Sequence, residues 1–169
     1  MSSPDPSGLG REIYVGLQAG RVDFAAYLPD SVLSGLEQLL DDDPEIHTLV
    51  CSREDEGVAV TMGAALAGRL PAVLMEGSGV GYCALILARA VSQRTSLLLL
   101  FSHTRAASSR FDYHGTSRVV GEAVCNGLGI PLTVIDDSAT ARARVTTAAV
   151  MAKGQSAVVA VAVPGYLRT

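Results

Sequence analysis

Charged residues are scarce in this chain of 169 residues. Only 18% of them are Asp, Glu, Lys or Arg, while 49% are hydrophobic, and the mean hydropathy is +0.33. Soluble domains usually carry about 25% charged residues, and large exposed apolar patches mark contact surfaces. We therefore expect part of the surface to face another subunit.

Long apolar runs and clustered basic residues are also missing. The longest apolar runs, such as LLLLF at 97–101, are far too short to cross a membrane. No basic segment followed by an apolar one opens the sequence, so we expect no secretory signal. A net charge of −4 with scattered Lys and Arg argues against nucleic acid. We expect neither a membrane nor a nucleic acid as a partner.

Cysteine is present at three widely spaced positions, Cys51, Cys83 and Cys125. An odd number at these spacings matches neither a disulfide framework nor a zinc site. We interpret them as reduced core residues, which predicts a cytoplasmic protein.

Segments with strand-like and helix-like patterns alternate along the chain. We expect strands near 22–28, 46–51, 71–76, 96–101, 131–136 and 157–163, and helices near 9–20, 31–41, 53–68, 80–92, 116–128 and 138–152. Continuously apolar strands between helices indicate a parallel sheet covered on both faces. The prediction is one α/β domain over residues 9–169, after a loose terminus at 1–8. Its sheet is doubly wound, mostly parallel and about six strands wide, with helices on both faces.

In such a fold, ligands gather at the carboxyl ends of the strands. Four loops qualify: LPDS at 28–31, CSREDE at 51–56, MEGSGVG at 75–81, and the polar stretch 102–115. The last contains His103, His114, Arg105 and Arg110, which suit an anionic substrate or else form a solvated loop.

Three consecutive acids, Glu54, Asp55 and Glu56, precede the small and apolar residues of the helix near 53–68. Ser52 and Asp55 fit the S-x-x-D pattern of a capped helix start, and acids in a first turn complement the helix dipole. Capping explains Glu54 and Asp55 better than Glu56, because Glu56 is followed at once by GVAV.

The GSGVG segment at 77–81 matches neither G-x-G-x-x-G nor the Walker pattern. It also lacks the G-x-S-x-G of a nucleophile elbow, since positions 76–80 are EGSGV. A tight turn that needs flexible backbone explains it as well as a ligand site does.

Three stretches together carry a family resemblance: YLPDSVLSGLEQLL, SREDEGVAVTMGAALAGRLPAVLMEGSGVG and GLGIP. Over about residues 13–163 the chain resembles the alpha subunit of sulfopyruvate decarboxylase and the corresponding half of phosphonopyruvate decarboxylase. Those enzymes use thiamine diphosphate, and the resemblance implies a pyrimidine-binding domain.

The resemblance gives Glu56 the family's glutamate, which hydrogen-bonds N1′ of the cofactor's aminopyrimidine and thereby helps the cofactor to lose its C2 proton. A dry setting would strengthen that bond. Ser78 and Gly79 then lie beside the aminopyrimidine.

The resemblance implies Asp30 and His114 as proton carriers. Arg105 or Arg110 is our candidate for binding the distal anion of the keto acid substrate, and Ser31 is a further candidate substrate contact. No metal ligand is implied on this chain.

Several family features are absent. This chain has MEGSGVGY where the family has Q-N-S-G-L-G-N, and SHTR at 102–105 where the family has arginine and glycine. It contains no Gly-Asp-Gly, and its only asparagine is Asn126, so it lacks the family's clamp for Mg²⁺ and the diphosphate.

A beta-type subunit is therefore expected to hold the diphosphate and Mg²⁺, in an α2β2 or larger assembly. Two alternatives stay open: a carboligase subunit that makes an acyloin or acetolactate-like product, and a non-catalytic regulatory subunit with the same fold.

Overall fold

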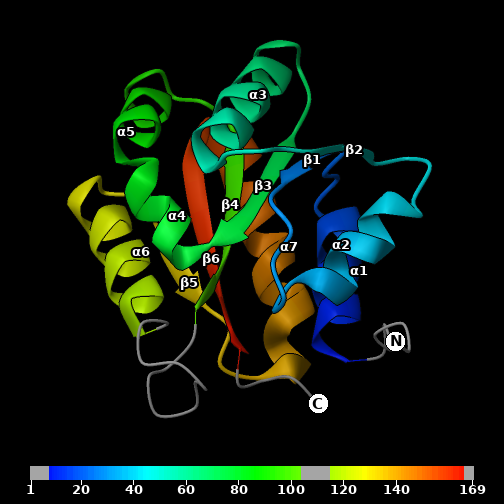
Figure 1. Ribbon diagram of the computed structural model, residues 1–169. Coiled ribbons are helices and arrows are strands. Elements are labelled where there is room, and N and C mark those ends of the chain that lie inside the picture. The colour runs from blue at the N-terminus through cyan, green and yellow to red at the C-terminus, as the bar shows by residue number, and fades with distance from the viewer. Residues whose placement is uncertain (1–7, 104–114, 166–169) are drawn as a thin grey trace.

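The computed structural model describes residues 8–103 and 115–165 (Figure 1). The strands are β1 (Phe24–Tyr27), β2 (His47–Val50), β3 (Pro71–Glu76), β4 (Leu97–His103), β5 (Leu132–Val134) and β6 (Val158–Pro164). The helices are α1 (Leu9–Ala19), α2 (Ser34–Asp41), α3 (Glu54–Leu66), α4 (Gly77–Tyr82), α5 (Ala84–Ser92), α6 (Gly115–Gly127) and α7 (Ser138–Gln155).

The six described strands form one sheet in the order β2-β1-β3-β4-β6-β5, and every neighbouring pair is parallel. This confirms the predicted doubly wound α/β fold. The chain leaves β1 toward one edge to form β2 and then crosses back to form β3. The strand order therefore reverses between β1 and β3, and a crevice outside the carboxyl ends of two such strands is the usual ligand site of an open α/β sheet.

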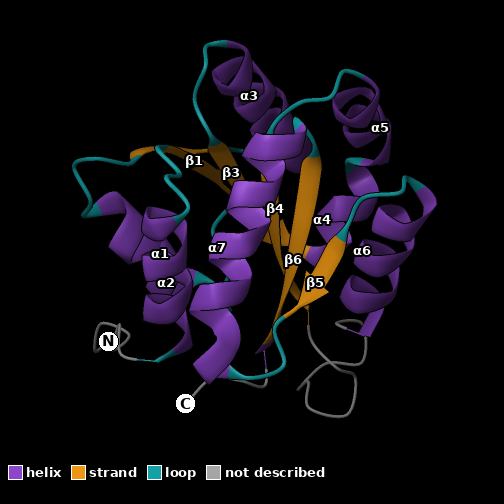
Figure 2. Ribbon diagram, turned by 180° about the vertical axis from the view of Figure 1, so that it is seen from behind, coloured by secondary structure: helices purple, strands orange, loops and turns teal. Residues whose placement is uncertain are grey.

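Helices cover both faces of the sheet, as predicted. Helices α1, α2 and α7 pack on one face, and α3, α4, α5 and α6 pack on the other (Figures 1 and 2). Side chains alternate between the two cores along each strand, because successive residues point to opposite faces. In β4, for example, Leu98 and Leu100 belong to the first core, whereas Leu97, Leu99 and Phe101 belong to the second.

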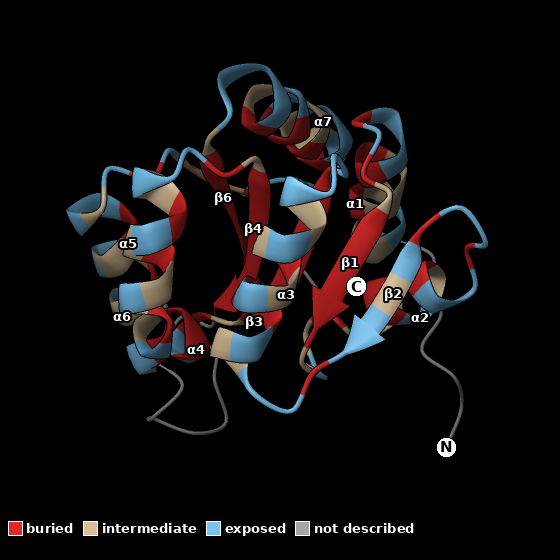
Figure 3. Ribbon diagram, turned by 90° about the horizontal axis from the view of Figure 1, so that it is seen from above, coloured by how far each residue is buried: buried red, intermediate tan, exposed pale blue. Residues whose placement is uncertain are grey.

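The central strands are buried on both faces, whereas the edge strand β2 is exposed along most of its length (Figure 3). Leu49 and Val50 on β2 are 40% and 57% exposed, and Leu85 on α5 is 71% exposed. The expectation that part of the surface faces another subunit stays a prediction.

Cys51, Cys83 and Cys125 are all buried and form no disulfide, as the sequence predicted. Across the ranges that the structure describes, none of the helices is both long enough and apolar enough to span a membrane.

Two boundaries differ from the sequence prediction. Strand β4 continues through Ser102 and His103, which are buried, so the loop expected from residue 102 begins later. The GSGVG segment is not a tight turn: it forms most of the short helix α4, and a break at Cys83 separates α4 from α5. The described part of the predicted terminus is Gly8, which directly precedes α1.

Helices α1 and α7 approach closely because α1 has a glycine at the contact. A Cβ atom on Gly16 would lie 2.9 Å from the Arg142 carbonyl oxygen and 2.9 Å from Cβ of Val145. Such crowding would force the two helices apart, since packed cores have little free volume.

We therefore expect Gly16→Ala to lower the free energy of unfolding by about 1–3 kcal/mol, the usual cost of overpacking. Gly63→Ala is the matched control, because Gly63 lies in a helix with open space around its Cα. There the substitution should stabilise by about 0.4–1 kcal/mol. Denaturant unfolding of both variants checks this, and equal effects at the two sites would contradict the packing argument.

Candidate functional site

The polar side chains of interest lie at the carboxyl edge of the sheet, around the reversal between β1 and β3. Asp30 follows β1, Glu56 lies in the helix after β2, Glu76 ends β3, and Ser102 lies at the end of β4. In the parallel pairing of β3 with β4, Glu76 lies directly beside Ser102. Sheet topology therefore brings together loops that are far apart in the sequence.

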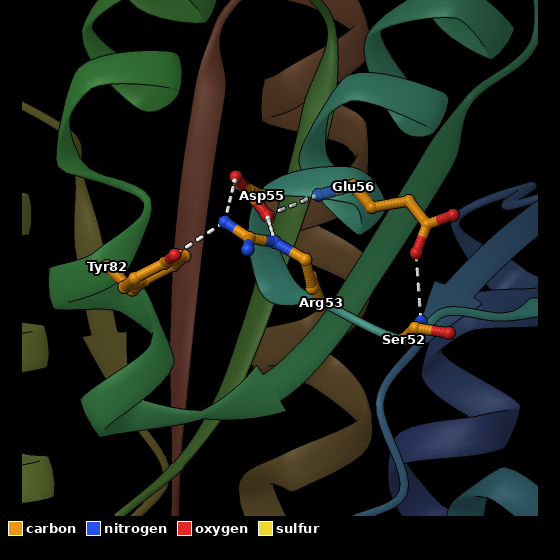
Figure 4. A network of polar contacts seen from close by, with 5 residues as sticks. All are labelled: Ser52, Arg53, Asp55, Glu56 and Tyr82. Atoms are coloured by element: carbon orange, nitrogen blue, oxygen red, sulfur yellow. Dashed lines mark hydrogen bonds and ion pairs between the residues drawn. The ribbon is translucent and has the colours of Figure 1, made fainter.

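Helix α3 begins differently from the sequence prediction. Its N-cap residue is Arg53, and no side chain caps it, so the predicted Ser52–Asp55 capping pair is wrong. Glu56 instead reaches back, and its carboxylate accepts a hydrogen bond from the Ser52 backbone N–H at 2.9 Å (Figure 4). In a capping box, the third residue of the helix accepts the backbone N–H of the N-cap residue. Here Glu56 is the third residue of α3, but it accepts the N–H of Ser52, the residue before the N-cap.

Asp55 has a different partner. Its carboxylate receives two hydrogen bonds from the Arg53 guanidinium, both at 3.0 Å, and these bonds hold the pKa of Asp55 below its ordinary value. Arg53 also donates to the Tyr82 hydroxyl and lies 5.0 Å from the centre of its ring. Figure 4 shows Glu56 pointing to the opposite side of the helix start from this cluster. Arg53 thus joins the start of α3 to the end of α4.

An open groove of about 850 Å³ lies between α3 and the α4–α5 pair. It is lined by Ser52, Arg53, Asp55, Glu56, Ala59, Tyr82, Leu85, Ile86 and Arg89. Apolar and charged side chains therefore share one concave surface, and Glu56, one of its lining residues, is solvent-exposed. The dry setting expected for Glu56 is not provided by the described residues of this chain.

Helix α4 lies close to its neighbours because three of its residues are glycines. Added Cβ atoms on Gly77, Gly79 and Gly81 would clash with the Ser117 carbonyl, the Glu54 side chain and the Val120 side chain, respectively. The glycines let α4 pack against both α3 and α6. Gly79 is therefore buried beside α3, the helix that carries Glu56, while Ser78 is exposed on α4.

Asp30 is held from two sides. One carboxylate oxygen accepts the backbone N–H groups of Val32 and Leu33 at 2.5 and 3.1 Å, and the other accepts the Ser102 hydroxyl at 2.8 Å. The bond to Ser102 joins the loop after β1 to β4, across the end of β3, which lies between them. The neighbouring Ser31 is exposed, and its carbonyl accepts the Ser34 hydroxyl at 3.3 Å.

Two acids at this edge were not selected from the sequence. Glu76 accepts a hydrogen bond from the buried Ser117 hydroxyl of α6. Glu37 is 7% exposed and accepts the Asp30 backbone N–H at 2.9 Å. A signal for Glu37 was present: it shares the apolar face of α2 with Leu33, Leu36 and Leu40, where an acid is unusual.

Burial raises the pKa of Glu37 to about 7. The hydrogen bond from the Asp30 N–H acts in the opposite direction, and the charges of Asp30 and Asp41 raise the pKa further. Asp41 itself accepts the Tyr27 hydroxyl at 2.6 Å. Burial and that hydrogen bond raise the pKa of Tyr27. Glu37 is thus an acid that changes its charge near neutral pH.

Three predicted site residues, His114, Arg105 and Arg110, lie outside the described residues. Within residues 8–103 and 115–165, no group of three or more His, Cys, Asp or Glu side chains is arranged to hold a metal ion.

The chain is similar to three curated proteins, each named sulfopyruvate decarboxylase subunit alpha. It is 34% identical to the protein of Methanothermobacter thermautotrophicus over 92 residues, which are 54% of this chain and 56% of that relative. It is 36% identical to the Methanocaldococcus jannaschii protein over 69 residues, 41% of each chain. For Methanococcus maripaludis the identity is 33% over 92 residues, 54% of this chain and 55% of the relative.

The chain resembles sulfopyruvate decarboxylase alpha subunits. This confirms the resemblance found in the motifs, although the match spans about half the length of these relatives. No family model matches the sequence.

Among solved structures, a 2-oxoglutarate:ferredoxin oxidoreductase from Magnetococcus marinus superimposes with a TM-score of 0.74 at 13% identity. The match covers 95% of this chain and 29% of that one. At this identity the likeness shows the α/β fold alone.

The raised pKa of Glu37 predicts a specific pH dependence of stability. The folded state holds the proton more tightly than the unfolded state, whose glutamate has its ordinary pKa of 4.5. Protonation of Glu37 therefore stabilises the folded state fully below about pH 4.5, and this stabilisation is lost as the pH rises through about 7.

Glu37→Gln removes this titration, so its free energy of unfolding should fall less than that of the wild type between about pH 5 and pH 8. Denaturant midpoints across that range measure the difference. Parallel curves for the two proteins would show that Glu37 does not titrate as described.

Proposed function

We propose that this chain is the pyrimidine-binding subunit of a two-chain, thiamine diphosphate-dependent decarboxylase. Its substrate is an anionic 3-substituted pyruvate of the sulfopyruvate or phosphonopyruvate type. The observation that carries the proposal is the position of Glu56 at the start of α3, on an open groove at the carboxyl edge of the sheet. The name shared by the three curated relatives supports the choice of reaction.

When bound, thiamine diphosphate supplies a carbon nucleophile and an electron sink for the decarboxylation of a 2-keto acid. Glu56 has the chemistry to take part, because a carboxyl group can share a proton with a ring nitrogen. Its hydrogen bond to Ser52 holds the carboxylate near the carboxyl end of β2 without burying it. The closely packed Gly79 and the exposed Ser78 on α4 are then the cofactor contacts on the neighbouring helix.

The exposure of Glu56 fits a site that is completed by another chain. A partner surface seated on the groove would cover Glu56 together with the exposed Tyr82 and Leu85 and remove water from them. Burial of this kind strengthens a hydrogen bond between a carboxyl group and a ring nitrogen. The sequence lacks Gly-Asp-Gly, so in this proposal the beta-type partner brings the ligands for Mg²⁺ and the diphosphate.

An anionic substrate needs a positive group, and the described edge is acidic. Asp30, Glu37, Glu56 and Glu76 all lie there, and the nearby Arg53 is paired with Asp55. Arg105 and Arg110 remain the proposed contacts on this chain for the distal sulfonate or phosphonate, because guanidinium groups bind such oxyanions in pairs of hydrogen bonds. Ser31, Asp30 and His114 remain the other proposed contacts and proton carriers. The cytoplasmic location also remains a prediction.

Glu56→Gln tests the role of the glutamate in the reconstituted complex with its partner. Gln keeps the shape but cannot share a proton, so exchange of the cofactor's C2 proton for deuterium should slow by about 10²–10⁴-fold. Acid quench followed by NMR of the released cofactor measures the rate. Release of carbon dioxide from sulfopyruvate should fall in parallel.

Glu45→Gln is the control, because Glu45 is an exposed acid before the opposite end of β2. It should exchange and decarboxylate as the wild type does. If Glu56→Gln retained wild-type exchange, the proposed role of Glu56 would be wrong. Identification of an acyloin in place of the aldehyde would favour the carboligase alternative.

A further inference from the structure

Glu37 is a buried acid whose surroundings differ from those of the other described buried acid, Asp43. The Asp43 carboxylate accepts hydrogen bonds from Tyr14, Gln18 and the Glu45 backbone, and its pKa is lowered. These hydrogen bonds stabilise the negative charge of Asp43, whose role is structural. For Glu37 the described contact is one backbone N–H, that of Asp30. An acid buried with so few donors is costly when charged.

The contact of Glu37 leads directly to the carboxyl edge. Its side chain turns back toward the start of α2, as helix side chains do, and accepts the Asp30 N–H at 2.9 Å. The carboxylate of Asp30 in turn accepts the Ser102 hydroxyl at 2.8 Å. Glu37 therefore holds the backbone of Asp30, while Ser102 holds its side chain.

Two carboxylates act on the charge of Glu37: Asp30 in the loop after β1, and Asp41 one turn further along α2. The Tyr27 hydroxyl on β1 donates to Asp41 and stays neutral, because its pKa is raised. A negative charge on Glu37 therefore adds to those of Asp30 and Asp41. The protonation state of Glu37 thus decides how much negative charge lies behind Asp30.

We propose that Glu37 is a positioning residue for Asp30. Together with Ser102 it holds the loop after β1, and its protonation state determines how much negative charge lies next to Asp30 and an incoming anionic substrate. The inference rests on the proposed function, because Asp30 is a proton carrier only in that reaction. Deprotonation of Glu37 places an additional negative charge at an edge that receives an anionic keto acid. It should therefore lower the rate.

The first test follows the Asp30 amide by NMR in the isotopically labelled chain, assembled with its partner and without substrate. The amide donates to the Glu37 carboxyl group, so its chemical shift should titrate with a midpoint of about 7. Glu37→Gln should abolish the titration while keeping an oxygen that accepts the same N–H. This readout requires no turnover.

The second test measures the pH profile of kcat/KM for sulfopyruvate with the same complex. In the wild type, kcat/KM should fall as the pH rises through about 7. In Glu37→Gln it should stay near the low-pH value across that range, whereas the Glu45→Gln control should keep the wild-type profile. Ser102→Ala should lower kcat roughly fivefold, the effect of one ordinary hydrogen bond, with little change in KM.

The outcomes separate the two proposals. If the wild-type complex neither exchanges the cofactor's C2 proton nor releases carbon dioxide, the proposed function fails, whatever the NMR titration gives. If the wild type is active but the Asp30 amide does not titrate, or Glu37→Gln keeps the wild-type pH profile, the role of Glu37 is overturned and the function stands. An unchanged kcat in Ser102→Ala would overturn the positioning of Asp30 by Ser102.

Discussion

The parallel arrangement of the sheet is the constraint on which the rest of this structure depends. The central strands β1, β3, β4 and β6 are buried on both faces, so their side chains are mostly apolar, and the ionisable Glu76 and His103 stand only at the carboxyl ends of β3 and β4. All neighbouring strands point the same way, and their carboxyl ends form one edge. Polar side chains that follow the strands are thereby gathered at that edge, although more than 70 residues separate Asp30 from Ser102.

That edge is built by short contacts between segments, each with an identifiable cause. Glycines bring α4 against α3 and α6, Arg53 joins α3 to Tyr82, and the bond between Asp30 and Ser102 crosses the end of β3. The described acids outnumber the described cations there, and Glu56 faces solvent. Both features fit the proposed function, in which a partner chain would supply the cover and a metal ion held by that partner would supply positive charge.

Much of the fold could be predicted from the sequence, because alternation of apolar strands and amphipathic helices reports the period of each element. The positions that were mistaken depend on tertiary contacts. The GSGVG segment has the composition of a turn, yet it forms most of α4, and its glycines leave room for Ser117, Glu54 and Val120 on the neighbouring helices. Ser52 fits a local capping pattern, but the chain enters α3 one residue later, and Glu56 takes the Ser52 N–H. Glu37 was overlooked although an acid on the apolar face of α2 is itself a signal, because the sequence does not show that its carboxylate accepts the Asp30 N–H.

The central claim is that this chain holds one half of a thiamine diphosphate site and that a partner holds the other half. Calorimetric titration of the cofactor with Mg²⁺ into this chain, the partner chain and the assembled complex tests it most directly. The account predicts tight binding to the complex and much weaker binding to either chain alone. Equally tight binding to this chain alone, or no binding to the complex, would contradict it.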